Sequence, residues 1–241
     1  MTIPNLTFKT ENLFKSKLLR GDTCYGGWTT MGSTVATELL GLSGFDWVLI
    51  DGEHGFNDYR SCVEQLLALN GTGAAAFIRP EHNDPVLLKR FLDFGFYNFL
   101  IPMIETAEAA EMAVRATRYP PEGYRGVSVS TRSNRFGLQL DYFKEINESI
   151  CLIVQIESVL GIQNVEEIAK IPGVDCLFIG PQDIAASLGF IANPAAKEVQ
   201  EVMKDLTKKI LNLGKRVGIL AASSTDAIVY RDWGIQFIGV G

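Results

Sequence analysis

Short apolar runs alternate with amphipathic segments along the chain. The runs are four to six residues long, which is typical of parallel strands buried on both faces. Between them, apolar residues recur at the three- and four-residue spacing of a helix with one buried face. The runs predict strands over residues 25–29, 47–51, 75–79, 98–102, 152–157, 176–180, 217–220 and 237–240. Helical spacing is found over 63–67, 86–91, 107–117, 165–168 and 199–213.

Eight strands that alternate with helices favour an α/β protein with a (β/α)8 TIM barrel, which we expect as a single domain over residues 1–241. A doubly wound sheet is the alternative, but it needs a glycine-rich phosphate loop after the first strand, and WTTMGST is not GxGxxG. The sequence stops at FIGVG directly after strand eight, so we expect a barrel without the eighth outer helix.

The longest irregular stretch covers residues 120–141 and is rich in Gly, Pro, Ser and Arg. A stretch of this length inside a compact barrel is usually functional. We therefore expect a lid or a subunit contact.

Composition narrows the range of ligands. The net charge of -6 and pI near 5.1 leave no basic stripe for nucleic acid, so a small molecule is the expected partner. No apolar run approaches the roughly 20 residues that span a bilayer, and the polar N-terminus is unlike a signal peptide, so we expect a cytoplasmic protein away from membranes. The four cysteines form no CxxC pair, and those at 24, 151 and 176 begin strands, which indicates buried free thiols.

Titratable side chains follow the second strand in the run FDWVLIDGEH. In a barrel of this class the chemistry lies where strands give way to loops, so Asp51, Glu53 and His54 are candidate site residues. The alternative is that Asp51 caps the next helix and His54 is a solvated loop residue.

Two further strand ends supply carboxylates, Glu157 in VQIE and Asp183 in GPQD. Two acidic oxygen ligands, with water completing the shell, are the usual way to hold Mg²⁺ or Mn²⁺. The alternative makes Asp183 a helix N-cap and gives Glu157 only backbone partners.

Arg79 ends an otherwise apolar strand, where its planar donors would match a carboxylate or an enolate. The alternative is a structural salt bridge to Glu53 or Asp51. The start of the helix at GPQD also attracts a carboxylate. Together these features describe a site for small α-keto acids. The lysines at 89, 170 and 215 are not at strand ends, which argues against a Schiff-base aldolase.

With these residues in place, the chain resembles the HpcH/HpaI family of metal-dependent pyruvate aldolases over nearly its whole length. The motifs are GFDWVLIDGEH, FYNFLIPMIET, TRYPPEGYRGVSVS, VQIES, GVDCLFIGPQDIAASLG and GIL. The resemblance implies that Glu157 and Asp183 hold a divalent metal ion, with Mg²⁺ expected first and Mn²⁺ or Co²⁺ as alternatives. It implies further that His54 is the catalytic base, supported by Asp51, and that Arg79 stabilises an enolate. The substrate-binding residues would be Gln155 and Leu220.

The resemblance is strongest to members that cleave 2-dehydro-3-deoxyglucarate (5-dehydro-4-deoxyglucarate) to pyruvate and tartronate semialdehyde. The alternatives are cleavage of 4-hydroxy-2-oxoheptanedioate or 2-keto-3-deoxyrhamnonate, or an impaired barrel without its eighth helix. The family implies a homo-oligomer, a hexamer that exchanges that helix between subunits. The chain departs from the family in having Gly55 and Phe56 after DGEH, where relatives commonly carry Ala-Pro, and AASST after GIL, where close relatives carry a proline.

Overall fold

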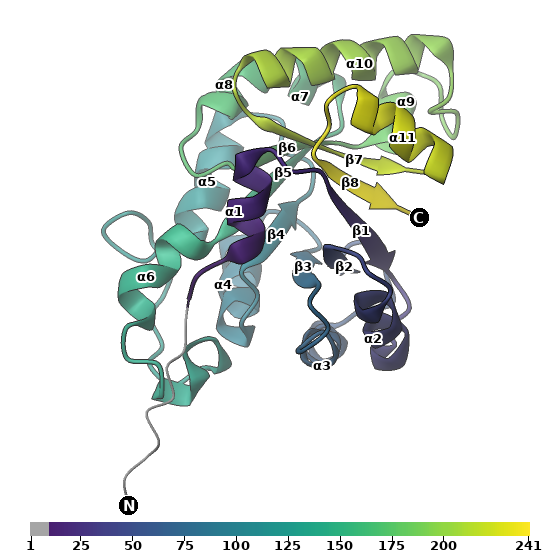
Figure 1. Cartoon of the computed structure of the whole chain (residues 1–241). Helices are drawn as coiled ribbons and strands as arrows, with labels where there is room; N and C mark the ends of the chain where they lie inside the picture. The colour runs from purple at the N-terminus through teal and green to yellow at the C-terminus, as the bar shows by residue number, and fades with distance from the viewer. Residues whose placement is uncertain (1–9) are drawn as a thin grey trace, which may run out of the picture.

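The structure, a computed structural model, describes residues 10–241, in which eight parallel strands close into a barrel (Figure 1). Each strand pairs with the next, and the last pairs with the first. The strands are β1 Cys24–Thr29, β2 Trp47–Asp51, β3 Ala75–Arg79, β4 Asn98–Ile101, β5 Cys151–Ile156, β6 Cys176–Ile179, β7 Arg216–Ala221 and β8 Phe237–Val240. The (β/α)8 fold and all eight predicted strands are therefore confirmed.

Helices surround the barrel, and most begin at a polar side chain that caps free N–H groups, such as Ser33, Asp58, Asp84 and Thr106. They are α1 Leu13–Arg20, α2 Thr34–Leu42, α3 Tyr59–Ala68, α4 Pro85–Phe94, α5 Ala107–Thr117, α6 Tyr142–Ser149, α7 Val159–Gln163, α8 Val165–Lys170, α9 Pro181–Ser187, α10 Lys197–Asn212 and α11 Ser224–Asp232. A 3₁₀ segment, η1, covers Arg132–Gly137. Within the part of the chain that the structure describes, none of these helices has the length and apolar character to cross a bilayer.

Alternating side chains along each strand build two cores. Outward residues such as Val48 and Ile50 pack under the helices, whereas inward residues such as Trp47 and Leu49 fill the barrel. Helix α1 lies against the amino-terminal ends of the strands (Figure 1), where Phe14 joins the inner core with its ring 5.0 Å from that of Phe77. Side chains therefore fill the barrel at the amino-terminal ends of the strands, a region we call the barrel floor. The carboxyl ends of the strands are left to carry the site.

The centre of this floor is a stack of two rings. Trp47 and Phe237 lie 4.0 Å apart with only 9° between their planes. Gly26 makes room for them, because a Cβ at this position of β1 would collide with the Trp47 ring. This packing fixes β1, β2 and β8 relative to one another.

The irregular stretch 120–141 lies between α5 and α6, so it connects a helix to the next strand. Its Arg125 is buried against Asp93 of α4, with Nη2 2.8 Å from Oδ1, and Arg132 donates to the Phe94 carbonyl at the end of the same helix. These contacts lie at the amino-terminal side of the barrel, away from the mouth. The stretch is therefore not a lid over this chain's own mouth, which corrects that expectation, and a subunit contact stays a prediction.

Another expectation concerns the cysteines. Cys24, Cys151 and Cys176 are buried and free, as predicted, and Cys62 is buried and free as well.

We predict that Phe237→Ala lowers the free energy of unfolding by about 3–5 kcal/mol, because it leaves a cavity beside Trp47 in the barrel floor. Leu140→Ala removes an exposed side chain and should change stability by less than about 0.5 kcal/mol. Urea unfolding followed by tryptophan fluorescence measures both. Equal losses of unfolding free energy for the two variants would contradict the stabilising role of the Trp47–Phe237 ring stack.

Candidate active site

The inward side chains at the tops of four strands converge on the barrel mouth. They are Trp28 of β1, Asp51 of β2, Arg79 of β3 and Gln155 of β5, each in step with the inner-core residues below it. Asp51 and Arg79 are direct partners in the β2–β3 register. Strand alternation and register therefore place a carboxylate beside a guanidinium before any loop contributes.

Arg79 is the centre of the site. Its Nε donates to Asp51 Oδ1 at 2.9 Å and its Nη2 to Asp51 Oδ2 at 2.6 Å, a bidentate ion pair. Its Nη1 lies 2.8 Å from Glu53 Oε2 and donates to Gln155 Oε1 at 3.4 Å. Trp28 completes this arrangement, since its ring lies 5.2 Å from the guanidinium carbon and its indole N–H donates to Asp51 Oδ2 at 3.1 Å. The salt bridges considered as an alternative role for Arg79 are thus both present.

The ion pair sets the charge of its two members. Burial opposes ionisation of Asp51, but the hydrogen bonds and charge of Arg79, with the Trp28 N–H, hold the pKa of Asp51 below its usual value. Burial also disfavours the charged guanidinium, but Asp51 and Glu53 outweigh it and raise the pKa of Arg79. Both groups are therefore charged at neutral pH.

Glu157 lies next to this pair, at the end of β5. Gln155 Nε2 donates to its Oε2 at 2.8 Å, and the Met103 backbone N–H donates to its Oε1 at 2.7 Å. Met103 adopts a left-handed conformation, φ 50°, which is strained for a residue with a side chain and recurs at functional sites. Gly180 at the end of β6 leaves room, since a Cβ there would lie 2.6 Å from Glu157 Oε2.

Negative charge accumulates around Glu157. Burial, together with the nearby charges of Asp183 and Glu53, raises the pKa of Glu157 to about 7, although the Met103 N–H opposes the shift. Burial likewise raises the pKa of Glu53, against the attraction of Arg79. The mouth thus gathers four carboxyl groups and one guanidinium, an excess of negative charge that a cation would relieve.

His54 and Asp183 lie at the rim. The His54 side chain is 70% exposed, and its Nε2 lies 3.8 Å from Glu53 Oε2. Asp51 accepts hydrogen bonds from the backbone N–H groups of Glu53 and His54, so it holds His54 through the backbone. Asp183 is exposed in the first turn of α9, whose N-cap is Gly180, so it is not the N-cap considered as its alternative role.

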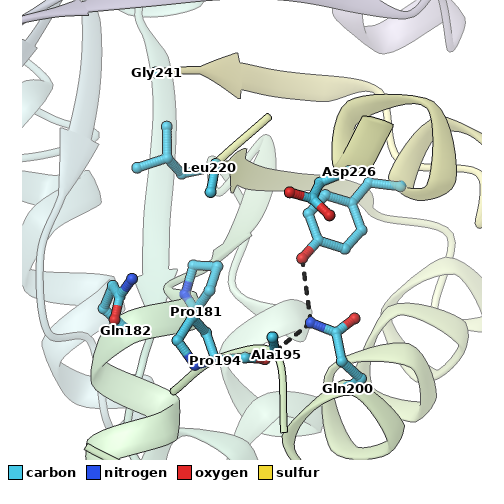
Figure 2. Close-up of a pocket in the computed structure, with 10 residues that line it drawn as sticks. Pro181, Gln182, Pro194, Ala195, Gln200, Leu220, Asp226 and Gly241 are labelled. Atoms are coloured by element: carbon cyan, nitrogen blue, oxygen red, sulfur yellow. Dashed lines mark hydrogen bonds between the residues drawn. The ribbon is translucent and has the colours of Figure 1, made fainter. Parts of the chain in front are cut away.

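A cavity of about 300 Å³ adjoins the mouth between β7, α9 and the helices α10 and α11 (Figure 2). Leu220, the inward residue near the end of β7, lines it together with Gln182, the residue before Asp183. Its far side carries Gln200, whose Nε2 lies 3.4 Å from the Tyr230 hydroxyl. The two predicted substrate-binding residues therefore do not line the same cavity. Leu220 lines this one, whereas Gln155 lies in the cluster around Arg79.

The residues present suit a hard divalent cation held by few protein ligands. Over residues 10–241, no cluster of three or more His, Cys, Asp or Glu side chains is arranged to hold a metal. Glu157 and Asp183 supply two carboxylates instead, the number that Mg²⁺ commonly takes from a protein, with water and substrate oxygens as the other ligands. Burial is the main cause of the raised pKa of Glu157, and the negative charge of Asp183 adds to it.

Two contributions to the site, from Trp28 and from the Met103 backbone, were not among the predicted residues. Trp28 follows the same strand-end rule as Asp51, so the sequence carried a signal for it. The Met103 N–H had no signal, because its left-handed backbone is not visible in the sequence.

The structure is a closed (β/α)8 barrel whose charged side chains gather at the carboxyl ends of its strands, where enzymes of this fold carry their active sites. The sequence profile described as HpcH/HpaI aldolase/citrate lyase matches residues 25–241, and the chain belongs to that family. The predicted family and enzyme class, a carbon-carbon lyase, are confirmed, and the family implies a divalent metal ion and a small-molecule substrate.

Named relatives refine this picture. The chain is 48% identical over 230 residues to 5-keto-4-deoxy-D-glucarate aldolase of Shigella boydii, covering 95% of this chain and 90% of the relative. It is 49% identical, with the same coverage, to the enzyme of that name in Salmonella paratyphi C. The crystal structure of an HpcH/HpaI aldolase/citrate lyase family protein from Burkholderia cenocepacia matches with a TM-score of 0.92 at 39% identity, over 95% of this chain and 92% of that one.

We predict that the metal-free protein loses stability as pH rises from about 4.5 to about 7. The pKa of Glu157 is higher in the folded state than in the unfolded state, so the protonated carboxyl contributes to stability. This contribution is complete below pH 4.5 and is lost as pH rises through about 7. Glu157→Gln should flatten this part of the profile, whereas Glu81→Gln, at an exposed carboxylate on the same rim, should not. Urea unfolding in EDTA at each pH measures the difference, and parallel profiles for all three proteins would contradict the assignment.

Proposed function

We propose that this chain, as a single barrel domain, is a metal-dependent pyruvate aldolase that cleaves 5-keto-4-deoxy-D-glucarate to pyruvate and tartronate semialdehyde. The observation that carries the proposal is the Arg79 guanidinium, held by Asp51 and Glu53 beside the buried Glu157 carboxylate. A fixed cation next to an acidic metal-binding surface suits an α-keto acid, which presents a carboxylate and a keto oxygen. The two named relatives support the choice of substrate.

In the cleavage direction, the carbon-carbon bond breaks and its electron pair passes to the pyruvate half, which becomes an enolate. Arg79 provides fixed positive charge for the oxygen on which negative charge develops, and a well-aimed donor of this kind is worth about 3 kcal/mol. Asp51 binds this guanidinium through two hydrogen bonds, so its charge is already oriented before the substrate binds. Gln155, between Arg79 and Glu157, keeps both groups oriented.

The bond breaks as the substrate hydroxyl on the aldehyde side loses its proton and becomes the new carbonyl. We assign His54 as the base for this proton, because its imidazole is exposed at the mouth and lies next to Glu53. The proton then returns to the enolate carbon and completes pyruvate. Leu220 and Gln182 line the cavity that would receive the aldehyde half.

We assign the divalent ion to Glu157 and Asp183, and Mg²⁺ is the expected ion in the cell, with Mn²⁺ and Co²⁺ as alternatives. When bound, the ion would polarise the keto group of the substrate and so lower the energy of the enolate-like transition state. A Schiff-base route would need a lysine at the mouth, and the inward strand ends here carry Trp28, Asp51, Arg79 and Gln155.

A coupled assay of pyruvate release from 5-keto-4-deoxy-D-glucarate tests the function. We expect EDTA to abolish cleavage and Mg²⁺, Mn²⁺ or Co²⁺ to restore it, because the enolate needs the charge of the ion. Borohydride added with pyruvate should leave no covalent adduct. A trapped adduct would refute the metal mechanism, and faster cleavage of 4-hydroxy-2-oxoheptanedioate or 2-keto-3-deoxyrhamnonate would change the substrate. Failure to cleave any of the three would indicate an impaired barrel.

The ligand assignment has its own test. We predict that Glu157→Ala and Asp183→Ala each weaken Mn²⁺ binding at least about tenfold, since loss of an outer-shell partner alone costs that much. Glu81→Ala, an exposed acid on the same rim, should bind normally. Electron paramagnetic resonance titration measures free Mn²⁺, and circular dichroism checks the fold. Normal Mn²⁺ binding by either of the first two variants would rule out that residue as a ligand.

A further inference from the structure

The turn that carries His54 is tied to a buried side chain of α3. Asn57 Nδ2 donates to the Asp51 backbone carbonyl at 2.8 Å and so closes the turn from residue 51 to residue 57. Gly55 fits inside this closure, because a Cβ there would collide with the same carbonyl. The Phe56 N–H donates to the Thr30 carbonyl at 2.8 Å, which holds the turn against the end of β1.

Gln65 of α3 holds Asn57 in place. It is fully buried, and its Nε2 donates to Asn57 Oδ1 at 2.5 Å and to the Ser61 carbonyl at 3.1 Å. Its Oε1 accepts from the hydroxyls of Thr37 at 2.8 Å and Thr29 at 3.3 Å. Both amide hydrogens of Gln65 are therefore used, and its oxygen faces two hydroxyls, of which that of Thr37 shares its one hydrogen with the Ser33 carbonyl at 2.9 Å. A buried network with this many partners restricts the motion of its members.

The four groups on Gln65 come from different elements. Thr29 ends β1, Thr37 lies in α2, Ser61 lies in α3 and Asn57 belongs to the turn after β2. One side chain therefore ties the turn to the first strand and to two outer helices.

His54 depends on this link more than the other site residues do. Asp51, Arg79 and Gln155 are buried and bonded to one another, whereas the His54 side chain is 70% exposed and has Glu53, at 3.8 Å, as its nearest acidic neighbour. Its place at the mouth is set by the turn backbone. We propose that Gln65 is a positioning residue that, through Asn57, fixes the DGEH turn and thereby the His54 imidazole.

This inference rests on the proposed role of His54 as the base. Gln65 touches no substrate and acts only through the turn. A misplacement of about 1 Å in a catalytic group can cost about a hundredfold in rate. We therefore expect Gln65→Leu to lower kcat about tenfold to a hundredfold, with a much smaller change in KM for the keto acid.

Three comparisons separate positioning from loss of stability. Asn57→Ala breaks the same link at a half-buried position and should lower kcat in the same way. It replaces Gln65→Leu as the test variant if that protein folds poorly. Thr207→Val removes a fully buried hydroxyl on α10, outside this network. This variant should lower the melting temperature and leave kcat unchanged. In a His54→Ala background, Gln65→Leu should lower kcat no further.

The chain has only two histidines, His54 and His82, so a direct readout without turnover is available. In the proton NMR spectrum of the folded protein, Gln65→Leu and Asn57→Ala should shift or broaden the imidazole signal that His54→Ala abolishes, and leave the other signal in place. A folded Gln65→Leu variant with unchanged kcat and two unchanged signals would overturn the proposal. If His54→Ala keeps full activity, the base assignment fails, while the NMR signals still report whether Gln65 fixes the turn.

Discussion

The bidentate ion pair between Arg79 and Asp51 is the interaction on which the mouth depends. It forms because β2 and β3 are paired with these two residues opposite each other, and below them the ring of Trp47 in β2 packs 5.8 Å from that of Phe77 in β3. Trp28, Glu53 and Gln155 are arranged around the same guanidinium. Breaking such a buried pair leaves an uncompensated charge, so these residues form one unit rather than independent contacts.

The charge of this unit explains what it can bind. Arg79 neutralises one carboxylate, and Glu53, Glu157 and Asp183 remain around it. Burial, with the nearby charges of Asp183 and Glu53, raises the pKa of Glu157, and a divalent cation would reverse this shift. The same mouth therefore offers fixed positive charge from Arg79 and an acidic surface for a metal ion, a combination suited to an α-keto acid and consistent with the HpcH/HpaI family.

The site is divided into a rigid centre and a supported rim. The centre consists of inward strand residues, whose positions follow from the closed barrel. The rim carries His54, which has little packing of its own and relies on the turn after β2. In our proposal the network from Gln65 to Asn57 gives that turn the rigidity which the barrel gives to the strand residues. Residues in the outer helices and in β1 thus influence the mouth through side chains that do not themselves line it.

The sequence by itself determined the barrel, because eight apolar runs separated by amphipathic helices allow few other closures. It also determined the candidates at the strand ends, Asp51, Arg79, Gln155 and Glu157, since buried parallel strands place polar residues only there. Tertiary structure alone decided which partners they take: both carboxylates on Arg79, the strained Met103 N–H on Glu157, and the exposure of His54. The physical reason is that strand alternation is a local property, whereas ion pairing, burial and turn closure depend on residues brought together from distant parts of the chain.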